Sequence, residues 1–139
     1  MRGVIPFLLA IFAAQSSADT SGRIHCNPGG AQIELNVCAY EEFVAADQAL
    51  NKTYQALLSK EGADALYVAK LRLAQKAWIE FRDAELEATF ACAKDDPKLC
   101  WGSVYPLAFN TVKTRLTNER NLRLAEILKK GRPADGVHN

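Results

Sequence analysis

Three long segments of the chain carry apolar residues at every third or fourth position. This period matches one face of an α-helix, and it predicts helices over residues 31–60, 63–93 and 103–130. Residues that favour helices, namely Ala, Leu, Glu, Lys, Gln and Arg, are frequent in all three segments. Gly62 and the stretch 94–102 separate the segments. No part of the chain requires a β-strand.

Each predicted helix has one apolar face, which we expect to be buried. The connections between the helices are short, so consecutive helices should run antiparallel. The predicted fold is therefore all-α, an antiparallel up-down bundle of three long helices. The residues expected on the buried faces are Phe43, Val44, Leu50, Tyr54, Leu57 and Leu58 in the first helix, Tyr67, Leu71, Ala74, Trp78, Phe81 and Ala88 in the second, and Tyr105, Phe109, Val112, Leu116 and Ile127 in the third.

Short polar side chains mark two of the expected helix starts. Asp64 and Ser103 are the predicted N-caps of the second and third helices, because their side-chain oxygens can accept hydrogen bonds from free backbone amides. Pro106 suits the first turn of the third helix, where its missing N–H costs nothing. Gly131 and Pro133 are expected to end that helix.

The first eighteen residues have the pattern of a secretory signal peptide. Arg2 precedes an apolar run at 4–14, and small residues at 16–18 form a cleavage site. The apolar run is shorter than the roughly 20 residues that a membrane-spanning helix needs. We therefore expect a signal peptide at 1–18 and a single domain at 19–139, with its core at about 26–130.

The sequence around the first cysteine argues against a lipid anchor. Cys26 follows Arg23, Ile24 and His25, whereas lipidation requires an apolar and a small residue directly before the acceptor cysteine. The processed chain should therefore be periplasmic or secreted, without a membrane anchor after the signal is removed.

Composition and cysteine content agree with an exported folded domain. The chain has 139 residues, of which 49% are hydrophobic and 24% charged. Its four cysteines predict two disulfides in an oxidising compartment, so the bundle is expected to be disulfide-stapled. A zinc site is the alternative, but the chain has no Cys-x-x-Cys pair, and its histidines, His25 and His138, are far apart in the sequence. We expect no metal and no cofactor.

Charge is balanced overall and uneven along the chain. Seventeen basic against sixteen acidic residues do not produce the dominant basic field of a nucleic-acid-binding protein. Residues 19–66 contain three basic and seven acidic side chains, and residues 67–139 contain thirteen and nine. The basic part of the third helix has no stacking aromatics between its charges, so we expect no nucleic-acid partner.

Several polar residues occupy positions where the helical pattern favours apolar ones. Asp47 on the first helix and Arg82 on the second are predicted to form a contact within hydrogen-bonding distance, supported by the amides of Asn51 and Gln75. Arg120 on the third helix falls on the same seam. Two interpretations remain open: the polar seam fixes the register of the helices, or it is a site for a ligand or partner.

The chain has no recognisable catalytic motif. It contains no glycine-rich phosphate loop, no His-Glu-x-x-His and no Gly-x-Ser-x-Gly sequence. We therefore predict that the protein is not an enzyme, and a hydrolase using paired carboxylates is kept as a remote alternative.

Three groups of residues resemble the LprI-like family. They are ADQALNKTY at 46–54, LRLAQKAWIEFRDAE at 71–85, and the set Gly102, Ser103, Pro106, Thr117 and Arg120. The similarity extends from Cys26 to about residue 124. It implies a small exported α-helical domain, in a family named after a lysozyme-inhibiting lipoprotein. The family motif includes the candidate binding residues Asp47, Asn51, Tyr54, Gln75, Trp78, Arg82, Asp83, Thr117 and Arg120.

The resemblance also implies a disulfide pairing. This chain has Leu86 and Val112 at positions where the family commonly has cysteines, and the joint loss of two cysteines implies that they were partners. Of the three connectivities that four cysteines allow, this favours Cys26–Cys38 together with Cys92–Cys100.

The resemblance favours a protein that works by binding. The leading prediction is a lysozyme inhibitor that occludes the enzyme cleft with the loop 94–102, which contains Asp95, Asp96 and Trp101. Trp101 is either an anchor for the partner or a cap over the bundle end. The alternative is a periplasmic interaction or scaffolding module for another envelope protein or for cell-wall material.

Overall fold

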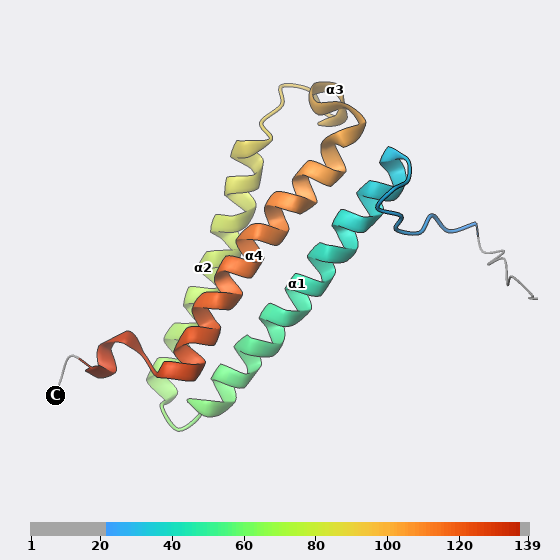
Figure 1. Cartoon of the computed structure of the whole chain (residues 1–139). Helices are drawn as coiled ribbons and strands as arrows, with labels where there is room; N and C mark the ends of the chain where they lie inside the picture. Colours follow the sequence, from blue (N-terminus) through green and yellow to red (C-terminus); the bar gives the residue numbers. More distant parts are fainter. Residues whose placement is uncertain (1–21, 137–139) are drawn as a thin grey trace, which may run out of the picture.

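A computed structural model describes residues 22–136, which form a bundle of three long helices (Figure 1). The predicted signal peptide lies outside the described residues. The long helices are α1 (Gln32–Lys60), α2 (Ala65–Thr89) and α4 (Tyr105–Lys130), and the short elements are α3 (Lys98–Trp101), η1 (Gly102–Val104) and η2 (Pro133–Gly136). No strand occurs between residues 22 and 136. The all-α fold expected from the sequence is therefore confirmed.

Local hydrogen bonds explain where the helices begin and end. The Asp64 carboxylate accepts from the backbone N–H of Tyr67 at 2.9 Å, so Asp64 is the N-cap of α2 as predicted. Ser103 is not the N-cap of α4, because η1 continues the chain to Val104 and no side chain caps the helix there. Gly131 ends α4 with φ of +88°, a conformation that glycine adopts without strain.

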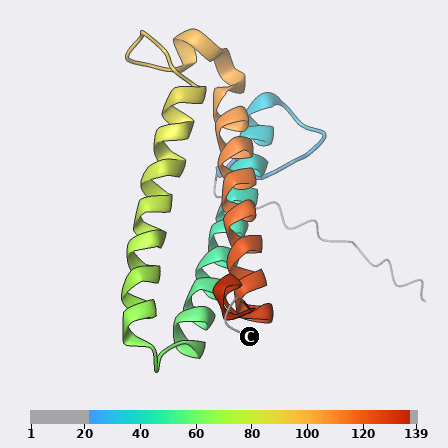
Figure 2. The same ribbon diagram turned by 90° about the vertical axis from the view of Figure 1, so that its left-hand side faces the viewer.

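The helices that follow one another in sequence run antiparallel, and α1 and α4 run parallel (Figure 1). These two parallel helices have the closest backbones in the bundle. Small side chains permit this approach, since Ala39 and Ala46 of α1 are buried. In the view of Figure 2, α2 stands apart from the other two helices. Larger side chains, such as Leu71 and Leu86, fill the wider space on its inner side.

The core consists of two apolar clusters with a polar layer between them. One cluster contains Leu50, Leu57, Leu58, Leu71 and Leu124, and the other contains Leu86, Phe90 and Leu116. The buried polar side chains are those of Gln75, Arg82 and Thr117. Along α2 and α4 these residues lie between the residues of the two clusters, so the polar seam predicted from sequence crosses the middle of the bundle.

Part of the predicted inner face of α2 was wrong. Phe81 is 56% exposed, and Ala74 and Ala88 are also exposed. Adjacent helical residues point about 100° apart, so Phe81 and Arg82 cannot both face inward. Arg82 takes the inward position, and Leu86, one turn later, becomes part of the core.

Asp64 joins the start of α2 to the segment that follows α4. Arg132 donates from Nη1 to Asp64 Oδ2 at 2.8 Å, and its guanidinium lies 4.6 Å from the centre of the Tyr67 ring. The backbone N–H of Tyr67 and the Arg132 side chain hold the pKa of the Asp64 carboxyl below its ordinary value of 3.8.

Substituting Asp64 is expected to reduce stability at neutral pH and to matter less in acid. Because the folded pKa of Asp64 lies below the unfolded one, its contribution is present above about pH 3.8 and disappears as the pH falls through the lowered value. The thermal unfolding midpoints of wild type and Asp64→Asn should therefore converge between pH 6 and pH 2. A difference that stays constant over this range contradicts the assignment.

Candidate functional site

The polar layer brings together side chains from all three long helices. Asp47 comes from α1, Gln75, Trp78 and Arg82 come from α2, and Arg120 comes from α4. On α2 the residues 75, 78 and 82 are three or four positions apart, so one face of the helix presents them together. Thr117 of α4 is fully buried in the same layer, and its hydroxyl donates to the carbonyl oxygen of Lys113 at 2.8 Å.

Arg82 is the most buried charge of the layer, and its closest partner is not the predicted one. Its Nε and Nη2 atoms each lie 2.8 Å from Asp83 Oδ1, the carboxylate of the next residue. The Asp47 carboxylate lies 4.0 Å from Arg82 Nη1, which is longer than a hydrogen bond. The prediction of a hydrogen-bonded Asp47–Arg82 pair was therefore wrong, and the two residues form a longer ion pair. The reason is that the guanidinium of Arg82 forms its short contacts with Asp83.

Asn51 forms its hydrogen bond with Asp47 and not with Arg82. Its Nδ2 donates to Asp47 Oδ2 at 3.0 Å, one helical turn away, and its side chain is exposed. Asn51 therefore orients Asp47 from the solvent side and does not enter the layer. Tyr54, the next motif residue on α1, packs against the apolar cluster that contains Leu50.

Two guanidinium groups lie over the ring of Trp78. The Arg82 guanidinium carbon is 5.3 Å from the indole centre, and that of Arg120 is 5.9 Å from it. Arg120 Nε also donates to Gln75 Oε1 at 3.0 Å, which ties α4 to α2. Burial, and then the neighbouring charge of Arg123, lowers the pKa of Arg120.

Lys113 belongs to this layer and was not predicted. Its ammonium group lies 4.2 Å from the centre of the Phe43 ring and 5.9 Å from that of Phe109. Burial, followed by the charge of Arg82, lowers the pKa of Lys113, while the Asp83 and Asp47 carboxylates oppose the shift. The only sequence signal for Lys113 was its place one turn before Thr117, on a helix whose many basic residues made it look like a solvated charge.

The contacts favour the structural interpretation of the polar layer. Its cations face carboxylates, an amide oxygen and aromatic rings of the same chain. These interactions join α1 to α2 and α2 to α4, and they can form only in one register. A partner could reach the exposed edges of Asp47 and Asp83, but Arg82 and Gln75 are buried.

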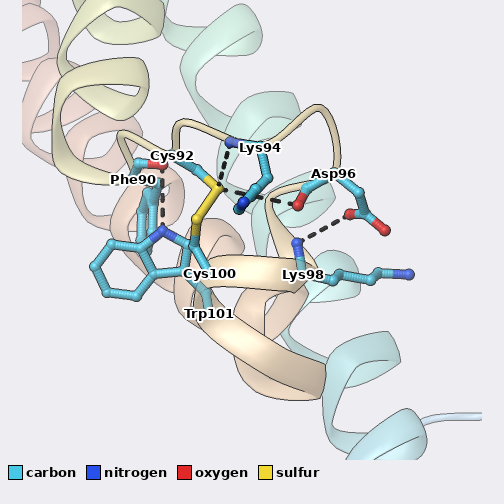
Figure 3. Close-up of a disulfide and its surroundings, with 7 residues drawn as sticks. All are labelled: Phe90, Cys92, Lys94, Asp96, Lys98, Cys100 and Trp101. Carbon is cyan, nitrogen blue, oxygen red and sulfur yellow. Dashed lines mark hydrogen bonds between the residues drawn. A yellow bond between two sulfur atoms is a disulfide. The ribbon is translucent and has the colours of Figure 1, made fainter.

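The second candidate site is the connection from α2 to α4 at one end of the bundle (Figure 3). The disulfide Cys92–Cys100 closes this loop, and Trp101 follows it directly. The Lys98 backbone N–H donates to Asp96 Oδ1 at 2.9 Å, and that of Lys94 donates to the sulfur of Cys92 at 3.4 Å. These hydrogen bonds, which lie within the loop, hold its backbone in one conformation.

Trp101 is both a cap and an exposed apolar surface. Its indole N–H donates to the carbonyl oxygen of Phe90 at 3.3 Å, and the two rings meet edge to face at 5.5 Å. The indole nevertheless remains 42% exposed. Leu99, 71% exposed, and Val104 lie on the same connection, and Asp95 and Asp96 are exposed beside them. The loop therefore presents apolar side chains next to two carboxylates and the two exposed lysines Lys94 and Lys98.

The second disulfide joins Cys26 to Cys38 at the start of α1. Both disulfides are the pairs that the family resemblance favoured. Asn36 Nδ2 donates to the carbonyl oxygen of Ser103 at 3.2 Å, which connects the beginning of α1 to η1. Both disulfide-closed segments therefore lie at the same end of the bundle, which also appears in Figure 1.

The described part of the chain has neither a metal-binding group of side chains nor a membrane-spanning helix. Between residues 22 and 136 no three His, Cys, Asp or Glu side chains are grouped so that they could hold a metal ion. Within the same part of the chain, no helix combines the length and apolar character that crossing a bilayer requires.

Comparisons with known proteins identify the family of the chain. A family model described as lysozyme inhibitor LprI matches residues 25–124. The chain is also similar to the uncharacterized protein R02472 of Rhizobium meliloti strain 1021, with 29% identity over 141 residues that cover 93% of this chain and 97% of that protein. No solved structure matches the chain.

Proposed function

We propose that this chain, which belongs to the lysozyme inhibitor LprI family, binds a lysozyme and inhibits it by covering the substrate cleft. The contact surface is the disulfide-closed end of the bundle, centred on the loop 94–102. The observation that carries the proposal is Trp101, which is anchored by Phe90 on one side and 42% exposed on the other. A rigid indole in this position buries a large apolar area in a partner without losing much side-chain entropy.

The distribution of charge supports this choice of surface. At the disulfide-closed end, the acidic residues Glu34, Glu41, Glu42, Asp95 and Asp96 outnumber the basic residues Arg23, Lys94 and Lys98. Lys60, Arg123, Lys129 and Lys130 lie toward the opposite end. A cationic enzyme is therefore attracted to one end of a molecule whose net charge is close to zero.

The same reasoning favours a binding protein that acts outside the cytoplasm. Two disulfides are stable in an oxidising compartment, and the pattern at residues 1–18 is that of a secretory signal. We therefore propose a periplasmic or secreted inhibitor rather than an enzyme.

A second candidate function is an interaction module for another envelope protein or for cell-wall material. The closed polar layer does not favour it, but the basic end of α4 does, because Lys129 and Lys130 are exposed there. This function would use the end of the bundle opposite to Trp101. A partner captured through those lysines, with no effect on lysozyme, would favour it.

The decisive experiment is a lytic assay with the purified, disulfide-bonded chain 19–139. We expect it to slow the lysis of a bacterial cell suspension by at least one of several lysozyme types. The reduced and alkylated chain is the control, because opening Cys92–Cys100 releases the loop that holds Trp101. Absence of inhibition by a micromolar excess, for every lysozyme type, contradicts the proposal.

A further inference from the structure

A groove of about 480 Å³ lies between the N-terminal segment, the first half of α1 and the start of α4. Its floor is apolar and includes Leu35, Ala39, Leu107 and the Cys26–Cys38 disulfide. Glu41 and Glu42 contribute to its wall. Neither the polar layer nor the Trp101 loop includes these residues, so the groove is a separate surface at the same end of the bundle.

The two glutamates are not used by the fold. The nearby Glu34 accepts from the backbone N–H of Ala31 at 2.7 Å and supports the start of α1. Glu41 and Glu42 are exposed, and neither makes a hydrogen bond or ion pair with another described residue. The groove therefore combines an apolar floor with two carboxylates that no cation of the described chain neutralises.

We infer that this groove is a docking site for a lysine or arginine side chain of a partner protein. The methylene stem of such a side chain can cover Leu35 and Leu107, while its charged head reaches Glu41 and Glu42. Charge-assisted hydrogen bonds to carboxylates offset the desolvation of the cation. A purely apolar occupant would desolvate the two carboxylates without compensation, and an anion would be repelled by them.

This inference rests on the proposed function, because it assigns a second contact for the cationic enzyme that Trp101 would engage. The Asn36–Ser103 hydrogen bond holds the groove and the loop in a fixed relation. One indole and its neighbours cover only part of the roughly 800 Å² that each partner buries in a stable complex. A basic side chain in the groove extends the contact along α1.

The test compares two double variants that remove the same charge. Glu41→Gln/Glu42→Gln neutralises the groove, and Glu119→Gln/Glu126→Gln neutralises two exposed carboxylates of α4 that pair with Arg115 and Lys130. We expect the groove variant to bind an inhibited lysozyme about tenfold or more weakly, with a reduced dependence on salt, and the control to bind within about twofold of wild type. Thermal unfolding of both variants verifies that they fold.

A second probe does not depend on lysozyme. N-acetyl-Leu-Arg-Leu-amide is titrated into the ¹⁵N-labelled wild-type chain, and we expect amide shifts at Leu35, Ala39 and Leu107 that Glu41→Gln/Glu42→Gln abolishes. If lysozyme is inhibited equally by wild type and groove variant and the peptide causes no such shifts, the groove inference is wrong and the proposed function stands.

The groove assignment can also hold when the proposed function fails. If no lysozyme is inhibited but the peptide shifts the groove residues, the proposed function is wrong and the groove assignment stands. If the wild-type chain self-associates with rising concentration and the groove variant does not, the groove belongs to a second copy and the inference is overturned.

Discussion

Arg82→Ala is expected to lower the free energy of unfolding by about 2–3 kcal/mol, and Asp47→Asn by less than about 1 kcal/mol. The asymmetry follows from burial. The Arg82 side chain is 10% exposed and is held against Trp78 and Asp83, so its removal leaves a void and a lost cation–π contact. Asp47 is 40% exposed and 4.0 Å away, so water replaces the missing interaction at little cost.

Arg82→Met distinguishes charge from packing. Methionine keeps most of the volume and avoids desolvating a cation, so this variant should lie within about 1 kcal/mol of wild type. Urea unfolding with both disulfides intact measures all three variants. If Asp47→Asn were as costly as Arg82→Ala, the two residues would form a tight buried pair in solution. If Arg82→Met folded but lost inhibition, the polar layer would be functional rather than structural.

Trp101→Ala is expected to weaken inhibition by about 30-fold or more, the loss typical of a buried aromatic anchor. It should also cost about 1 kcal/mol of stability, because the edge-to-face contact with Phe90 disappears. The inhibition constant in the lytic assay measures the first effect, and thermal unfolding measures the second.

Leu122→Ala is the matched control for Trp101→Ala. Leu122 is 71% exposed and lies in the second half of α4, away from the disulfide-closed end. Its removal should leave inhibition unchanged. An unchanged inhibition constant for Trp101→Ala would show that the indole only caps the bundle, whereas equal losses in the two variants would point to a general effect of apolar surface.

Features set by local chemistry were predictable from the sequence. The three helices follow from an apolar period that does not depend on partners. The Asp64 cap follows from a side chain that bonds to an amide three residues away. The disulfides followed from the family pattern rather than from physics, since spacing alone left three pairings open.

Features set by the relative rotation and distance of helices were not predictable. The helical pattern placed Phe81 and Arg82 near the same seam, and only the rotation of α2, which packs Leu86 against Leu116 of α4, decides between them. The distance between Asp47 and Arg82 depends on the distance between α1 and α2, and the pattern of apolar residues along the chain does not determine that distance. Lys113 was missed because its partners, Phe43 and Phe109, come from two different helices.

The close pairing of α1 with α4 has a consequence for the order of assembly during synthesis. These helices are the first and last long elements, and the hydrogen bonds that join α1 to α4 and to the η1 turn before it span 68 and 67 positions of the sequence. A growing chain that ends before α4 lacks Leu124, Ile127 and Leu128, so Leu50 and Leu57 are covered only by residues of α2 and the core stays incomplete. We therefore expect the bundle to close only after its final helix has been synthesised, and the shorter nascent chain to remain accessible to proteases until then.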